Sequence, residues 1–270
     1  MKGTKKMKKF IKKQNHIIGM FALMIVSMIA FSCNKESATE NSSSSQLTME
    51  NVRIGELHNV FCKEILNRQK EEKSVIVSTE AVLEWMDICA ETAENMNLGT
   101  HDDIQESTGL AKGFFMAFGN DENGENLLFS EKVFIEDEIE GLLEQAGCPE
   151  DVKMVIMEMY NGCVEGAMKK PADDYLALME TLPSSIHKTV FIDIYKHSRM
   201  FWREEGNSKE SGNPPGGMSC EDWSSVMDAI GGTIGIGLGG GLLSWFVSTA
   251  VGTAFSVAAA NDCEEPAAAK

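Results

Sequence analysis

The sequence has few basic residues once its amino-terminal segment is set aside. It contains 24 lysines and arginines against 41 aspartates and glutamates, and seven of the lysines lie in the first 13 residues. Without those seven, 17 basic residues face 41 acids, a net charge near −24. Such a surface repels nucleic acid and anionic lipid headgroups. We therefore expect no nucleic-acid partner.

The sequence also lacks the patterns that usually identify an enzyme. His58 and Cys62 lie four residues apart and would share a helix face, but no further His or Cys at ligand spacing supports a metal site or a nucleophile pair. We interpret them as a surface histidine beside a core or disulfide cysteine. The glycine-rich GIGLGG has no strand-loop-helix context for a dinucleotide. We expect no catalytic residues, no cofactor and no metal.

Strand-like alternation of apolar and polar residues is scarce too. Apolar residues instead recur every three or four positions, which predicts helices. The expected helices begin near residues 49, 78, 130, 149, 172 and 186 and make up an acidic α-helical domain over residues 48–205. Residues 113–129, with a turn-like GNDENGEN centre, are an alternative β-hairpin. The predicted fold class is mainly α.

The first 32 residues have the pattern of a lipoprotein signal peptide. A basic stretch, MKGTKKMKKFIKKQNH, precedes the uncharged IIGMFALMIVSMIAFS. Residues 30–33, AFSC, resemble a lipobox, in which the thiol of Cys33 receives the diacylglycerol, although Phe31 departs from its commonest form. An ordinary cleaved signal and an uncleaved anchor helix are the alternatives. We expect a lipoprotein bound to the bilayer through acylated Cys33.

A polar tether follows at residues 33–47. It has almost no apolar residues and cannot bury enough surface to order itself. Asn34 stands where an aspartate would argue for retention at the inner membrane. The expected location is the cell envelope, as an outer-membrane lipoprotein that is surface-exposed or released after cleavage.

The carboxy-terminal part has no charge over a long stretch. A Gly, Pro and Ser-rich linker at residues 206–218 separates it from the helical domain. Residues 219–270 are expected to form an apolar, glycine-rich, membrane-active segment, uncharged from Ala229 to Ala260. Small residues recur every fourth position, so helices could approach closely there. The candidate membrane-active residues are Gly231, Gly235, Gly239, Trp245, Phe246, Gly252 and Phe255.

Cys220 and Cys263 bracket this segment. Six cysteines remain besides Cys33, and six thiols permit 15 pairings. A continuous helix would separate these two by about 60 Å, whereas a disulfide requires Cα atoms within about 7 Å. A single membrane span and a Cys220–Cys263 disulfide therefore exclude each other. If the two pair, the segment folds back near residues 237–241 into a glycine-rich apolar helical hairpin.

This organisation resembles proteolytically activated, bacteriocin-like lipoprotein toxin precursors. The resemblance implies a lipid-anchored precursor that is cut in the linker and then permeabilises a target-cell membrane. Arg199, Arg203 and Lys209 are the candidate sites for an activating protease. Because residues after Arg203 carry nine acids and two lysines, a target-cell receptor is also expected.

Two other functions stay open. The first is a structural or interaction lipoprotein of the envelope, whose apolar segment packs permanently within its own fold. The second is an enzyme, which a bound metal or dependence on His58 would indicate. In addition, residues 52–59, VRIGELHN, are similar to a Gly-x-x-His-Asn opening of small bacterial lipoproteins, a similarity that implies no role.

Overall fold

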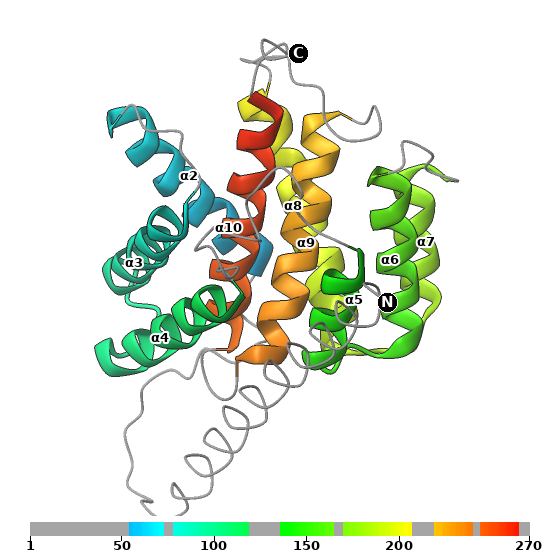
Figure 1. The fold of residues 1–270 in the computed structure, drawn as a ribbon, viewed down its shortest axis with the longest axis horizontal. Coiled ribbons are helices and arrows are strands. Elements are labelled where there is room, and N and C mark those ends of the chain that lie inside the picture. Colours follow the sequence, from blue (N-terminus) through cyan, green and yellow to red (C-terminus); the bar gives the residue numbers. More distant parts are fainter. Residues whose placement is uncertain are drawn as a thin grey trace, which may run out of the picture. The chain divides into compact units, whose positions relative to one another are not determined.

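The computed structural model describes residues 54–72, 78–118, 136–164, 170–206, 219–239 and 244–264. These residues form nine helices and no strand, which confirms the mainly α prediction. Figure 1 shows their arrangement. The helices are α2 (Ile54–Glu72), α3 (Thr79–Asn95), α4 (His101–Phe118), α5 (Glu136–Gln145), α6 (Glu150–Val164), α7 (Ala172–Thr181), α8 (Ile186–Gly206), α9 (Cys220–Leu238) and α10 (Ser244–Glu264).

Local sequence signals set several helix ends. The side chain of Ser78 accepts a hydrogen bond from the backbone N–H of Ala81 and caps α3. Ser219 caps α9 in the same way through Asp222, whose charge also suits the positive end of the helix. After α5, Gly147 takes a positive φ of 71°, which glycine adopts without strain. Each of these ends depends only on residues that are close together in the sequence.

Helix α4 is an element that the periodicity did not predict. Its buried face, which includes Ile104, Ala111 and Phe115, packs against α3 and α10. The β-hairpin considered from residue 113 is wrong in its first part, because α4 continues to Phe118. Glycines at positions 109 and 113 weaken the helical signal, and tertiary packing overrides that preference.

Helices α9 and α10 pack along each other in opposite directions. Gly231 lies against Gly252 and Phe255, whereas Gly235, one turn later, lies against Ser248. The partner on α10 therefore moves back along the chain as α9 advances. Residues 240–243, which join the two helices, lie outside the described residues. The turn expected at residues 237–241 begins later than predicted, because α9 is helical through Leu238.

The α9–α10 pair lies at the centre of the helical unit. Helix α9 contacts α8, α5 and α6, and α10 contacts α2, α3 and α4 (Figure 1). Every residue from Trp223 to Ile236, and from Trp245 to Ala260, is buried. The other helices therefore cover a pair that has little polar surface.

Several sequence predictions fall outside the described part of the chain. The signal peptide (residues 1–32), Cys33 and the tether (33–47) all do, and so do residues 207–218 of the linker. Among the helices that are described, none combines the length and the hydropathy of a membrane span.

Candidate functional site

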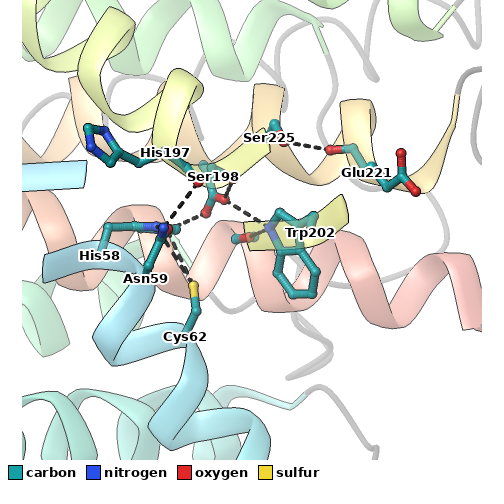
Figure 2. Close-up of polar contacts among 10 residues, drawn as sticks. His58, Asn59, Cys62, His197, Ser198, Trp202, Glu221 and Ser225 are labelled. Carbon is teal, nitrogen blue, oxygen red and sulfur yellow. Dashed lines mark hydrogen bonds and ion pairs between the residues drawn. The ribbon is translucent and has the colours of Figure 1, made fainter. Parts of the chain in front are cut away.

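A buried carboxylate, Asp228 on α9, lies at the centre of a polar network inside the apolar core. It is fully buried, and three side chains from two other helices donate to it. His58 Nε2 on α2 lies 2.6 Å from its Oδ1. The hydroxyl of Ser198 and the indole N–H of Trp202, both on α8, donate to its Oδ2 (Figure 2). The carboxylate therefore joins three helices, as a buried charge requires paired and hydrogen-bonded partners.

The network also reaches α10. Trp202 lies one helical turn beyond Ser198, so both side chains leave the same face of α8. The indole N–H of Trp202 is 3.1 Å from Asp228 Oδ2 and 2.7 Å from Ser256 Oγ on α10. The indole N–H of Trp202 thus links α9 and α10, the two helices of the central pair.

The protonation state of His58 follows from its neighbours. Its Nδ1 lies 3.2 Å from the side-chain oxygen of Asn59, and the Asn59 amide donates to the backbone oxygen of His197 at 3.0 Å. An amide oxygen only accepts, so Nδ1 carries a proton. Nε2 faces a carboxylate and carries a second one. Burial acts to lower the pKa of His58, but the electrostatic interactions with Asp228 and Cys62 and the hydrogen bonds with both side chains together outweigh it and hold that pKa well above the ordinary value.

The thiol of Cys62 completes the cluster. It lies one turn after His58 on α2, with Sγ 3.4 Å from His58 Nε2. Burial raises the pKa of this thiol, which the neighbouring His58 only partly opposes, so at neutral pH the sulfur is protonated. The three donor atoms of His58, Cys62 and Asp228 all lie within 4.8 Å of one another.

This arrangement differs from that of a nucleophile–base–acid triad. In a triad, one ring nitrogen of the histidine faces the nucleophile and the other faces the acid. Here the same nitrogen, Nε2, faces both Cys62 and Asp228, while Nδ1 faces Asn59. All three members of the cluster are fully buried. The geometry suits charge neutralisation or metal binding better than nucleophilic attack.

The Gly-x-x-His-Asn pattern at the start of α2 has a structural explanation. A Cβ on Gly55 would lie 2.5 Å from His197 Nδ1 and 2.6 Å from the backbone oxygen of Asp193, so only glycine lets α2 approach α8 this closely. The backbone N–H of Gly55 also donates to the Asp193 side chain at 2.7 Å. His58 and Asn59 then bind α9 and α8 as described above. The pattern is therefore a docking motif for α2.

The candidate membrane-active glycines lie where the two central helices touch. A Cβ on Gly235 would be 2.7 Å from the Ser248 Cα, and one on Gly239 would be 2.7 Å from the Ser244 Cα. A Cβ on Gly231 would be 3.0 Å from the Gly252 Cα. These positions allow backbone-to-backbone packing of α9 on α10.

The candidate aromatic residues of α10 are all fully buried. Trp245, Phe246 and Phe255 have no exposed surface. Phe246 makes an edge contact with Phe61 of α2, and Phe255 packs against Phe115 of α4. In this fold they belong to the hydrophobic core.

The predicted disulfide is not formed by the residues that the structure describes. Cys220 is a half-buried free thiol at the first position of α9, and the side chain of Cys263 lies outside the described residues. Cys62, Cys89, Cys148 and Cys163 are buried, and they form no disulfide with another described cysteine. The pairing of Cys220 with Cys263 stays a prediction.

The three candidate cleavage residues have different surroundings. Arg199 lies within α8, its side chain is 22% exposed, and it binds Asp173 of α7 at 2.6 Å and Asp222 of α9 at 3.1 Å. Arg203 is exposed in the last turn of α8. Lys209 lies outside the described residues.

The sequence interpretation of His58 was also wrong, because this histidine is fully buried. Its partner Asp228 comes 170 residues later in the chain, and spacing along one helix cannot reveal such a partner. A usable signal was Asp228, the last charge before the uncharged stretch. A carboxylate in that position needs a partner.

Comparison with protein-family models, with curated proteins and with solved structures gave no match to this chain.

Proposed function

We propose that this protein is a lipid-anchored precursor whose helical body covers a membrane-active helical hairpin, formed by α9 and α10, until proteolysis frees it. The observation that carries the proposal is the burial of every residue of this hairpin from Trp223 to Ile236 and from Trp245 to Ala260. A target membrane would replace the surrounding helices as the apolar environment. The lipid at Cys33 would keep the precursor at the envelope.

The composition of the hairpin supports its transfer to a bilayer. Between Trp223 and Ala260 the described residues hold a single charged side chain, Asp228. Glycines at the α9–α10 contact bring the two backbones together, so that the hairpin can enter lipid as a unit with its backbone groups satisfied. In water the same surface would aggregate unless it is covered.

Polar contacts hold the hairpin in the body and explain why it stays there before activation. Asp228 is bound by His58 and Ser198, and Arg199 binds Asp222 in the first turn of α9. A buried pair is strongly destabilised when one partner is removed. Polar contacts therefore hold the hairpin in the body, in addition to the helices that cover it.

The chain between α8 and α9 suits cleavage. Residues 207–218 include Gly, Pro and Ser at most positions and one lysine, Lys209. A cut there would break the covalent connection between the hairpin and Cys33. The contacts of α9 and α10 with the other helices would still hold the hairpin in place. Release would then depend on a membrane or receptor that competes with the body.

The test uses a variant with the recognition sequence of a sequence-specific protease in place of residues 207–213. The cut protein is added to bacterial cells and to liposomes of phosphatidylethanolamine and phosphatidylglycerol, and membrane potential and dye release are recorded. We expect depolarisation after the cut and none from intact protein. Activity on cells without dye release from liposomes would indicate a receptor.

A matched control carries the same recognition sequence in place of residues 120–126, which join α4 to α5. Cutting there nicks the body but leaves α9–α10 attached to α8, so we expect no activity. Equal inactivity of all cut and intact proteins would contradict the proposal.

A structural or interaction lipoprotein is the second candidate. The observation that favours it is that α10 supplies core aromatics to α2 and α4 through Phe246 and Phe255. If the hairpin co-purifies with the body after the linker is cut, and stays inactive in the presence of membranes, this function is preferred.

A further inference from the structure

We propose that His58, Cys62 and Asp228 form a binding site for one Zn²⁺ ion at the junction of α2 and α9. The site does not depend on the proposed function, because it follows from the donor atoms alone. Imidazole nitrogen, thiolate sulfur and carboxylate oxygen are the three kinds of protein ligand that zinc accepts.

Two of the three distances between the donor atoms are within about 1 Å of those around a tetrahedral zinc ion, and all three donor atoms lie within 4.8 Å of one another. With zinc bonds of 2.0 to 2.3 Å, two ligand atoms lie about 3.3 to 3.6 Å apart. Cys62 Sγ and His58 Nε2 are 3.4 Å apart and already fit. His58 Nε2 and Asp228 Oδ1 are 2.6 Å apart, so they must separate by less than about 1 Å.

The site stays electrically neutral when the ion enters. Without metal, the imidazolium of His58 balances the carboxylate of Asp228, and Cys62 is a neutral thiol. With Zn²⁺, the imidazole is neutral, and the thiolate and the carboxylate balance the two charges of the ion. Two protons leave, one from His58 Nε2 and one from Cys62 Sγ. The buried core therefore gains no net charge.

The surroundings match those of a ligand histidine. A metal-bound histidine commonly donates its other ring N–H to an oxygen. His58 Nδ1 has this partner in the oxygen of Asn59, which is itself oriented by the His197 backbone. Ser198 and Trp202 donate hydrogen bonds to Oδ2 of Asp228, so that Oδ1 faces the histidine. The ligands are oriented before any ion binds.

A buried hydroxyl group from α10 lies beside the same cluster. Thr253 on α10 interacts with Cys62 and lowers the pKa of its thiol. Its hydroxyl is buried and therefore belongs to the same enclosed polar cluster as the three donor atoms.

The test is metal loading of the mature full chain. Because the cluster is fully buried, the protein is refolded from urea with Zn²⁺ or Co²⁺ and then desalted. We expect one retained ion per chain, release of two protons per ion, and a thiolate-to-cobalt absorption band in the Co²⁺ form. Asn59→Ala should weaken binding by about 10–100-fold.

Matched cysteine variants separate this site from surface binding. Cys62→Ser should abolish the thiolate-to-cobalt band, while Cys163→Ser, at an equally buried cysteine of α6, should leave it unchanged. Circular dichroism checks that each variant folds. Folded wild-type protein that retains no ion, or that binds cobalt without the thiolate band, overturns the proposal, and so does retention unaffected by Cys62→Ser.

Discussion

At the scale of single residues, Asp228 has the largest consequence in this chain. It is a full charge inside the hydrophobic core, and folding removes it from water completely. It is tolerated because His58 neutralises it and because Ser198 and Trp202 donate to its second oxygen. Burying such a charge without these partners would cost several kcal/mol, on the order of the stability of a whole domain.

The variant Asp228→Ala should destabilise the metal-free protein by about 3–5 kcal/mol, because it leaves His58 as an unpaired buried group. It also removes the acceptor of the Ser198 hydroxyl. The measurement is urea denaturation in a chelator. The control is Asp87→Ala, which removes an exposed ion pair with Lys112 and should cost about 0–1 kcal/mol. Similar losses of stability for both variants would show that the Asp228 network does not hold the hairpin in the body.

At the scale of the elements, the contact between α9 and α10 depends on glycines. Their backbones meet at Gly231, Gly235 and Gly239, where a methyl group would lie within about 3 Å of the other helix. Glycine is a poor helix former, so these positions weaken each helix alone. Close packing of the pair offsets that cost.

The substitution Gly235→Ala should therefore destabilise the protein by about 1–3 kcal/mol, since its Cβ would be 2.7 Å from the Ser248 Cα and would push the helices apart. The same change at Gly109 of α4 is the control. Nothing lies within 4 Å of a Cβ there, so Gly109→Ala should stabilise by about 0.5–1 kcal/mol. Thermal unfolding of the two variants measures whether each substitution raises or lowers the stability. A gain in stability at Gly235 would contradict the close contact.

At the scale of the whole molecule, the amphipathic helices and the central pair have unequal roles. The body supplies the charged surface, and the pair supplies much of the core. Apolar packing joins the two parts, for example through Phe61–Phe246 and Phe115–Phe255, and the polar contacts between them include the Asp228 network and the ion pair of Arg199 with Asp222. This division is what a covered membrane-active element requires, and it is the basis of the proposed function.

The predicted lipid anchor is tested by Cys33→Ser. Without the thiol there is no acceptor for the diacylglycerol, so we expect loss of labelled fatty acid and a shift of the protein from the membrane fraction to the soluble fraction. Cys220→Ser is the control, because its thiol lies at the start of α9 within the folded unit and should leave the anchor intact. Unchanged lipid labelling in Cys33→Ser would refute the lipobox assignment.

The sequence by itself determined the features that depend on near neighbours. Helical periodicity predicted most of the described helices, and the caps at Ser78 and Ser219 and the glycine after α5 involve residues only a few positions apart. Helix α4 was missed because its glycines weaken the local signal and its packing partners are distant.

Only the tertiary structure decided the site. The sequence paired His58 with Cys62 because they are one turn apart, but it could not bring Asp228 or Ser198 to them. It also offered Arg199 as a cleavage site, whereas packing of α7, α8 and α9 makes it a partly buried ion-pair residue. The physical reason is the same in both cases. A buried charge is stabilised by groups that folding gathers from separate helices, and no local pattern records which groups those are.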